Sequence, residues 1–269
     1  MRYCRFWISC LGLSVVFSLQ TFCLAEKTTS EGEFEEECAL FLEAMNFYHG
    51  NGVERNIPKA VELFEQAALE EHHVNSMKML VRIYSLGEGV EVDEEKILKF
   101  LQMAAGAGDA DSQFTMGMVL IASKNPEQKK DSVVWFERAA EQNHPEAQRT
   151  LGIFCSTGKY LPKNDEKAVF WFQKAADLND AMAQLALGMA LRDGVGTPKN
   201  EKLAFSYLLK SAKRGLAEAQ YNVAVCYING TGVKRDTRKA VPWLRKSADQ
   251  GFAQAIQLLE KVGIPHSSL

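Results

Sequence analysis

Cysteine, histidine and paired glycine are the residues of this sequence whose types and spacing could support chemistry. Cys38, Cys155 and Cys226 offer thiols, and His72 and His73 offer imidazoles. Metal sites gather such residues through spacings like Cys-x-x-Cys or His-x-x-x-His, and the sequence contains neither. Adjacent histidines on a helix would point to different faces. There is also no Gly-x-Ser-x-Gly motif and no Ser-His-Asp arrangement, so we expect no catalytic residue, metal site or cofactor.

Paired glycines recur in the spacing that phosphate-binding loops use. Gly-x-Gly occurs at residues 50–52, 87–89, 194–196 and 230–232. In nucleotide-binding folds this spacing follows a strand, whereas each pair here follows a helix-like segment. Glycine adopts positive φ without strain, so each pair lets the chain leave one helix and reverse its direction. The pairs therefore predict turns between helices.

Composition indicates a folded protein that does not bind nucleic acid. The 269 residues are 46% hydrophobic and 24% charged, with a formal net charge of −3. That apolar share excludes general disorder. A near-neutral balance argues against nucleic acid as a partner, because phosphate binding needs concentrated Lys and Arg.

The first 25 residues have the order of a secretory signal peptide. Arg2 and Arg5 make the start positive, residues 6–19 form a largely apolar run, and residues 23–25 read small-x-small. The run is short for a membrane span, and the alternatives are an uncleaved anchor or a buried first helix. We expect residues 26–269 to be exported without a stable membrane span. The destination is the periplasm or exterior of a bacterium, or the secretory pathway of a eukaryote.

A repeat of about 36 residues dominates the rest of the chain. A pair of small residues recurs as Ala67-Ala68, Ala104-Ala105, Ala139-Ala140, Ala175-Ala176, Ser211-Ala212 and Ser247-Ala248. The second members are 37, 35, 36, 36 and 36 residues apart. Five residues before each of them stands a large apolar side chain, from Leu63 in the first copy to Trp243 in the sixth. We expect these large side chains to pack against a neighbouring helix that the small residues hold close.

A second helix-like segment precedes each small pair. Glycine recurs at one register position in it, as Gly117, Gly152 and Gly188. Glycine inside a helix costs about 1 kcal/mol relative to alanine, so its recurrence predicts the close approach of a facing helix.

The repeats set the predicted domain boundaries. An acidic lead-in at 26–35 precedes six helix pairs, a capping helix covers the last pair, and residues 263–269 form a tail. The predicted ranges are 36–73, 74–109, 110–145, 146–181, 182–217 and 218–252, with the cap at 253–262. The third turn, at 123–127, and the fourth, at 156–162, depart from Gly-x-Gly. These two departures predict a bend in the stack of helix pairs, a feature that sets ligand specificity, or sequence drift without a function.

The sixth copy carries a family pattern. It reads Gln220-Tyr221-Asn222-Val223-Ala224, then Gly230-Thr231-Gly232-Val233, then Lys239-Ala240 and Trp243, followed by Ser247-Ala248. This pattern resembles the Sel1-like repeat, a relative of the tetratricopeptide repeat, over about residues 36–262. The resemblance implies an all-α, right-handed superhelical solenoid of antiparallel helix pairs, with the first helix of each pair on the concave side. Such repeats are interaction modules with many unrelated partners.

A second stripe lies beside the packing stripe on the first helix of each pair. In similar repeats these positions touch peptide ligands, so the resemblance implies a protein-binding groove. Its candidate residues are Phe41, Met45, Tyr48, Lys78, Arg82, Phe114, Met118, Ile121, Arg149, Ile153, Leu185, Met189, Arg192, Tyr221 and Val225. Aromatic rings, flexible methionines and arginines suit a bound protein segment. The alternative is that these side chains only pack adjacent first helices together.

We favour a non-enzymatic, monomeric adaptor or scaffold that binds a protein. A cysteine-rich branch of similar repeats is linked to β-lactam binding and hydrolysis, but it carries two cysteines within each repeat. Here Cys38, Cys155 and Cys226 fall in separate repeats. Two repeats separate Cys155 from Cys226, which exceeds the roughly 7 Å that a disulfide spans. We expect buried packing residues, although an odd count also allows a free thiol or an intermolecular bond. A secreted effector acting on a host is the third interpretation.

Overall fold

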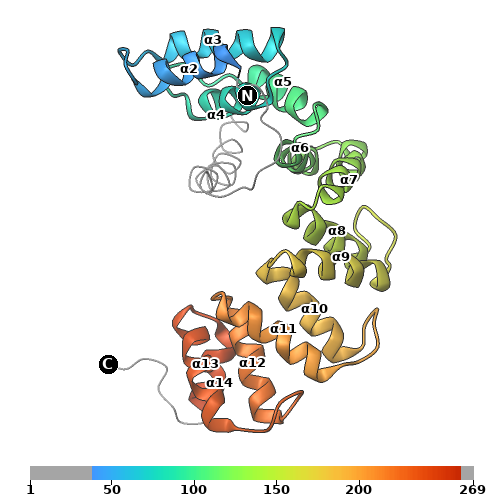
Figure 1. The fold of residues 1–269 in the computed structure, drawn as a ribbon. Helices are drawn as coiled ribbons and strands as arrows, with labels where there is room; N and C mark the ends of the chain where they lie inside the picture. Colours follow the sequence, from blue (N-terminus) through green and yellow to red (C-terminus); the bar gives the residue numbers. More distant parts are fainter. Residues whose placement is uncertain (1–37, 262–269) are drawn as a thin grey trace. The chain divides into compact units, whose positions relative to one another are not determined.

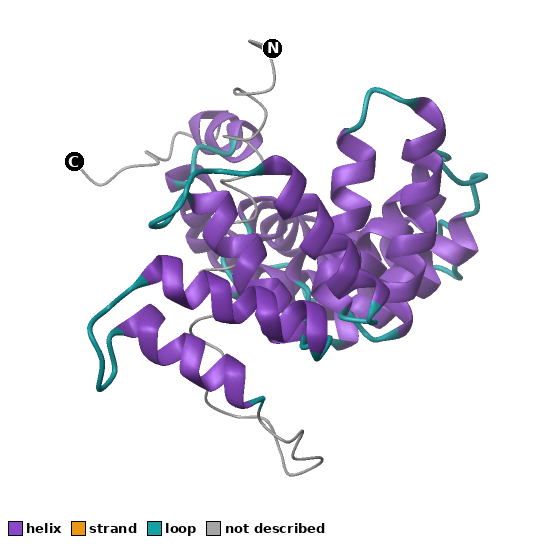
Figure 2. Cartoon of the chain, turned by 90° about the horizontal axis from the view of Figure 1, so that it is seen from above, coloured by secondary structure: helices purple, strands orange, loops and turns teal. Residues whose placement is uncertain are grey.

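The computed structural model describes residues 38–261 (Figure 1). The predicted signal peptide, the acidic lead-in and the tail lie outside these residues, as does Val262 of the predicted cap. The described part of the chain consists of thirteen α-helices joined by loops, with no strand (Figure 2). The all-α prediction is confirmed.

The chain divides into two compact units between Val119 and Leu120, inside helix α6. Unit 1 contains α2 (Ala39–His49), α3 (Ile57–Glu70), α4 (Val74–Leu86), α5 (Glu94–Gly106) and most of α6 (Ala110–Ala122). Unit 2 contains the end of α6, α7 (Pro126–Glu141), α8 (Pro145–Thr157), α9 (Asp165–Asp177), α10 (Ala181–Asp193), α11 (Glu201–Lys213), α12 (Ala217–Asn229), α13 (Thr237–Asp249) and α14 (Ala253–Lys261).

Helices pack in consecutive pairs, as the repeat predicts. We call the even-numbered helices α2 to α12 the first helices and the odd-numbered helices α3 to α13 the second helices. The pairs α2–α3, α4–α5, α8–α9, α10–α11 and α12–α13 are each in contact, and α14 packs on α13. In each of these five pairs a loop of seven residues joins the two helices. Only three residues, Ser123–Asn125, join α6 to α7, so the third copy lacks the usual loop.

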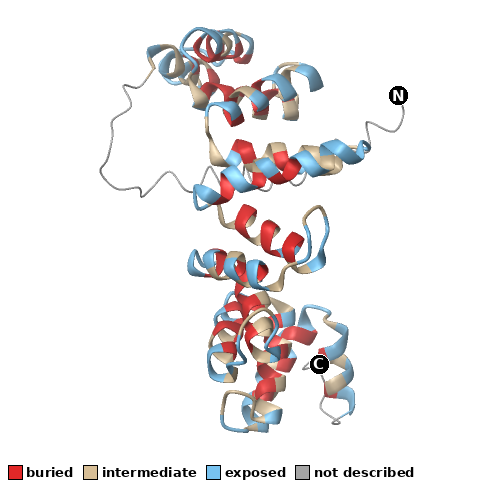
Figure 3. Cartoon of the chain, turned by 90° about the vertical axis from the view of Figure 1, so that its right-hand side faces the viewer, coloured by how far each residue is buried: buried red, intermediate tan, exposed pale blue. Residues whose placement is uncertain are grey.

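Buried residues lie on the faces where paired helices meet (Figure 3). The predicted close approach at the helix glycines is confirmed for two of them. A Cβ on Gly152 would lie 2.6 Å from the ring of Phe172, and one on Gly188 would lie 2.8 Å from Cγ of Leu208. The expectation for the large apolar residues is met by Leu63, Phe100 and Tyr207, which are buried, and needs correction for the three tryptophans. Trp135, Trp171 and Trp243 are only half-buried, and the residue after each of them fills the core.

On all six second helices the residue one position after the predicted large side chain is also buried. These residues are Phe64, Leu101, Phe136, Phe172, Leu208 and Leu244. Two of the half-buried tryptophan rings are covered by a cation of the following turn. Arg138 lies 4.9 Å above the ring of Trp135, and Lys246 lies 5.1 Å above that of Trp243. The small residues of the stripe, such as Ala67 and Ala104, are fully buried, so the stripe lies in the core and only its tryptophans reach the edge.

In the last two Gly-x-Gly loops the second glycine lies where no side chain fits. A Cβ on Gly196 would lie 2.1 Å from the carbonyl oxygen of Asp165, and one on Gly232 would lie 2.0 Å from that of Glu201. These two loops therefore pack directly on the backbone that begins the preceding second helix. In the fourth copy Tyr160 occupies the equivalent position with φ +66°. That conformation costs an L-residue about 1–2 kcal/mol, and the ring of Tyr160 packs edge-on against Phe154 at 5.0 Å.

A row of buried glutamines joins consecutive repeats, and sequence reading missed it. Each glutamine, near the start of a first helix, donates a hydrogen bond to a carbonyl near the end of the preceding second helix. The bonds run from Gln113 to Ala105, from Gln148 to Ala140, from Gln184 to Ala176 and from Gln220 to Ala212, at 2.9–3.3 Å. The side-chain oxygen of Gln220 accepts a further bond from Gln250 at 2.9 Å. Within the described chain, the same oxygens of Gln148 and Gln184 have no partner.

We predict that Leu178→Gln stabilises the protein by about 1 kcal/mol. Leu178 ends α9 at the position that Gln250 takes at the end of α13. A glutamine there would give the buried oxygen of Gln148 the donor that it lacks. Urea unfolding followed by circular dichroism should show a higher midpoint for the variant. Leu178→Glu is the matched control, because its carboxylate has no N–H to donate. Equal shifts in both variants would exclude the hydrogen bond as the cause.

Candidate protein-binding surface

The candidate site is the predicted stripe on the first helices, which we call the first-helix stripe. In unit 1 it lies on α2, α4 and α6, and in unit 2 on the end of α6, α8, α10 and α12. Two of its apolar residues are exposed, Met118 by 39% and Ile153 by 40%. Eleven others are half-buried and thus open to a partner: Phe41, Met45, Lys78, Arg82, Phe114, Ile121, Arg149, Met189, Arg192, Tyr221 and Val225.

Two predicted residues belong to the core instead. Leu185 is 6% exposed and packs with Leu208 and Val223. Tyr48 is 5% exposed, and its hydroxyl donates a 2.8 Å hydrogen bond to Glu88. Burial raises the pKa of Tyr48, and the hydrogen bond to Glu88 raises it further. Neither side chain offers surface to a ligand.

The aromatic residues of the stripe pack between repeats on one side. The ring of Phe41 lies 5.8 Å from that of Phe64 and 4.7 Å from that of His73. The ring of Tyr221 lies 5.4 Å from that of Phe252. These rings therefore pack against neighbouring aromatic rings on one side. Because they are only half-buried, the rest of each ring stays accessible to a ligand.

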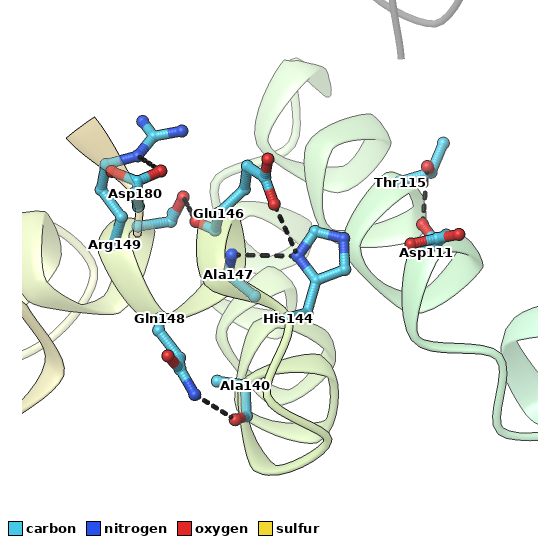
Figure 4. Close-up of polar contacts among 10 residues, drawn as sticks. Asp111, Thr115, Ala140, His144, Glu146, Ala147, Gln148, Arg149 and Asp180 are labelled. Carbon is cyan, nitrogen blue, oxygen red and sulfur yellow. Dashed lines mark hydrogen bonds and ion pairs between the residues drawn. The ribbon is translucent and has the colours of Figure 1, made fainter. Parts of the chain in front are cut away.

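Two cations of the stripe are fixed by the start of the next first helix. Arg149 contacts Asp180 at 3.0 Å, and Asp180 also caps α10 by accepting from the amide of Ala183 (Figure 4). In unit 1, Lys78 contacts Asp109 at 2.9 Å, and Asp109 accepts from the amide of Ser112. Each ion pair thus links a first helix to the next one.

Arg192 makes the corresponding link from α10 to α12. It donates to the side-chain oxygen of Asn222 at 2.9 Å and also pairs with its neighbour Asp193 at 2.8 Å. The hydrogen bond from Arg192 holds the pKa of Asp193 below its usual range. Arg82 lies close enough for its charge to lower the pKa of Tyr48, against the stronger effects that raise it.

Sequence reading missed the anionic partners of these cations. Asp109 and Asp180 stand three residues before the small residue that marks each first helix, two repeats apart. The same position holds His73 and His144, whose Nδ1 atoms face the amides of Ser76 and Ala147 (Figure 4 shows His144). A search for helix-capping residues at the repeat spacing would have found these four residues.

A small pocket adjoins the stripe in unit 2. Its volume is about 210 Å³, and Met189 of the stripe lines it together with Phe172, Val169 and Ala186. Sites for small molecules usually measure about 300–1,000 Å³. The pocket is thus suited to a single apolar side chain of a bound segment.

The thiols of the described residues are free and serve packing or capping. Cys155 and Cys226 are buried, and Sγ of Cys38 accepts from the amide of Phe41 at 3.3 Å. Burial raises the pKa of all three thiols, which disfavours the reactive thiolate. Over residues 38–261 no group of three potential ligands could hold a metal ion. None of the helices in that range is both long and apolar enough to cross a membrane.

Comparison with known proteins supports the repeat. The Sel1 repeat model matches residues 39–72, 82–109, 121–144, 145–180, 181–216 and 217–252. The crystal structure of c5321, a protective antigen of uropathogenic Escherichia coli with an SLR fold, is similar with a TM-score of 0.75 and 25% identity. That match covers 85% of this chain and 50% of the antigen. A Sel1 repeat protein from Oxalobacter formigenes has a TM-score of 0.66 and 27% identity, over 83% of this chain and 64% of that protein.

A curated relative matches over a shorter stretch. The chitin synthase regulator SKT5 of Saccharomyces cerevisiae is 33% identical over 131 residues, which are 46% of this chain and 19% of the regulator. The chain thus spans about half of the E. coli antigen and about a fifth of the yeast protein.

We predict a coupling energy of about 1 kcal/mol between Arg149 and Asp180. Their side chains are 22% and 11% exposed, so water screens the pair only partly. A double-mutant cycle with Arg149→Ala and Asp180→Asn, read by urea unfolding, measures this energy, and asparagine keeps the helix cap. The exposed pair Lys130–Glu127 serves as control, with an expected coupling of about 0–0.5 kcal/mol. Equal coupling in both cycles would contradict a structural role for the Arg149 pair.

Proposed function

The chain belongs to the Sel1 repeat family, and we propose that it is a non-enzymatic adaptor that binds a protein segment along the first-helix stripe. Sel1 repeat proteins typically mediate protein–protein interaction, and their fold is generally a non-enzymatic scaffold. Both statements concern the family, and the location of the contact on this chain is our proposal.

The observation that carries the proposal is that apolar side chains of the stripe are exposed next to polar side chains held in fixed positions. Ile153 lies one turn after Arg149 on α8 and is 40% exposed. Asp180 holds Arg149 in place, and Asn222 holds Arg192. A surface whose side chains are already ordered loses little conformational entropy on binding, which favours affinity.

The pocket beside Met189 gives the bound segment an anchor. Protein interfaces draw most of their affinity from a few large side chains buried in such pockets. Methionine at the rim adapts its shape to different side chains, because its thioether is flexible and polarizable. We therefore expect the ligand segment to present at least one apolar side chain to unit 2.

We further propose that the adaptor works outside the cytoplasm, in the bacterial envelope or the secreted space. The signal-like residues 1–25 support this location. The E. coli structural neighbour is a protective antigen, which is consistent with it.

Substitution of the exposed stripe residues should abolish partner binding without unfolding the protein. We predict that Met118→Asp and Ile153→Asp remove the dominant protein captured from a lysate of the source cell by residues 26–269. A carboxylate at either position would have to be desolvated against an apolar partner, which costs more than the roughly 2–7 kcal/mol of an unpaired neutral polar group. Mass spectrometry identifies the captured protein, and circular dichroism verifies the fold.

Two matched controls lie on second helices. Leu98 on α5 and Val134 on α7 are similarly exposed, by 46% and 49%. Leu98→Asp and Val134→Asp should leave capture intact. Loss of the partner with these variants, or its retention with the stripe variants, would refute the first-helix stripe as the contact surface.

Export predicts a shortened N-terminus. Expressed in full length in its source cell, the protein should be recovered from the periplasmic or extracellular fraction and begin at Glu26 by N-terminal sequencing. Replacing Arg2 and Arg5 with glutamate should reduce export, because the positive start of a signal peptide is then lost. Recovery of an intact Met1 terminus from the cytoplasm would disprove this location.

A further inference from the structure

The net charge of the chain is small because its two units carry opposite charges. Residues 38–119 carry 13 acidic and 6 basic side chains, whereas residues 120–261 carry 15 acidic and 22 basic side chains. The basic excess concentrates in repeats five and six. Between Lys199 and Lys246 there are 11 basic and 3 acidic residues, and all 11 basic side chains are exposed.

The opposite charges occupy equivalent loops of the repeat. We define the acidic loop as residues 87–95, which lead from α4 into the first turn of α5, and the basic loop as residues 230–238, which lead from α12 into the first turn of α13. Both begin with a glycine in left-handed conformation, at φ +64° and +77°. Each contains an aspartate, Asp93 or Asp236, that caps the second helix by accepting from two amides. The two backbones thus follow the same path.

Two of the three charged side chains stand at the same positions in both loops. Glu91 in the acidic loop corresponds to Lys234 in the basic loop, and Glu95 corresponds to Arg238, whereas Glu94 and Arg235 have no charged counterpart. Both loops are anchored at the same point by a valine, because Val90 and Val233 each pack on the core of their unit. The loops therefore differ mainly in the sign of their exposed charge.

Within residues 38–261 these charges are not neutralised by ion pairs. Glu91, Glu94 and Glu95 are exposed and take part in no salt bridge, and the same holds for Lys234, Arg235 and Arg238. Glu88 is the exception in the acidic loop, because it pairs with Arg55 at 2.7 Å. Three free charges of one sign on each loop thus face solvent.

We propose that the acidic loop of one molecule binds the basic loop of a second copy of this chain. Each molecule carries one loop of each sign, so complementary patches meet head to tail. Such a contact is heterologous, and it builds chains or rings of molecules. Each loop carries three charges of one sign, two of them at matching positions, and this gives electrostatic complementarity, which governs orientation and encounter rate.

This contact is separate from the first-helix stripe and does not depend on the proposed function. Both loops lie at the ends of first helices, where they lead into second helices. The expectation of a monomer rested on the chain as a whole and did not separate the charges of its two units. The proposed contact instead predicts self-association that high salt reverses.

Sedimentation velocity of residues 26–269 over a concentration series tests the proposal. We expect association at about 0.1 M salt and monomers at about 1 M, because the Debye length falls from about 10 Å to about 3 Å. The triple reversal Lys234→Glu, Arg235→Glu, Arg238→Glu should give monomers at both salt concentrations. The triple reversal Glu91→Lys, Glu94→Lys, Glu95→Lys should do the same.

An equimolar mixture of the two reversed variants is the decisive sample. Each variant now carries two loops of one sign, so the mixture should associate although each variant alone is monomeric. The control variant carries the same charge change at exposed positions outside the loops, Lys124→Glu, Lys159→Glu and Lys167→Glu. It should associate like the unsubstituted protein.

Three results would overturn the proposal. They are a monomeric unsubstituted protein at low salt, association that the loop reversals leave unchanged, and a mixture of reversed variants that stays monomeric. Vesicles containing an anionic phospholipid are added as a separate sample. Binding of a monomeric protein to these vesicles, lost with the reversal at Lys234, would reassign the basic loop to a lipid headgroup.

Discussion

Beside side-chain packing and ion pairs, contacts with the backbone join consecutive repeats, and the freedom of the exposed side chains depends on these contacts. The loop that carries Gly232 lies on the carbonyl of Glu201 at a distance that excludes a Cβ. The glutamine row, from Gln113 to Gln220, binds the last carbonyls of the second helices. Because these contacts use glycine, glutamine and main chain, they place few demands on the exposed side chains. Loops with one backbone path can therefore carry opposite charges, as the acidic and basic loops do.

The third copy shows what happens where this contact is altered. Its helices α6 and α7 are joined by Ser123–Asn125 alone, so the loop that would pack on a neighbouring second helix is missing. The division between the two units falls within α6 of the same copy. In the following copy Tyr160 replaces the second loop glycine and packs on Phe154. The departures that the sequence shows at residues 123–127 and 156–162 thus mark the region where the regular repeat is interrupted.

How far the sequence predicts this molecule depends on the physical role of each residue. Gly152 and Gly188 each face a side chain that leaves no room for a Cβ, so the close approach expected from the sequence is present. A period of 36 residues fixes the register of the helices but not the depth of each position, so Trp135 is half-buried although Phe100 at the same position is buried. For the same reason Tyr48 and Leu185, expected on the stripe, are buried.

Partners distant in sequence were harder to predict. Asp180 stands 31 residues after Arg149, and only the packing of α8 beside α10 brings the two together. Spacing indicates that a residue recurs, but it does not show which side chains will meet. The glutamine row was within reach, because a small residue followed by glutamine recurs at the repeat spacing from Ser112-Gln113 to Ala219-Gln220.

The half-buried tryptophans of the second helices have a spectroscopic consequence. Trp135, Trp171 and Trp243 all lie in unit 2, whereas the large phenolic rings of unit 1 are those of Tyr48 and Tyr84. Indole emission from the described residues therefore originates in one unit alone. Far-ultraviolet dichroism follows the helices of both. Tryptophan fluorescence from the described residues thus follows unit 2 alone. Comparing its unfolding transition with that of the dichroism shows whether the two units unfold together or one after the other.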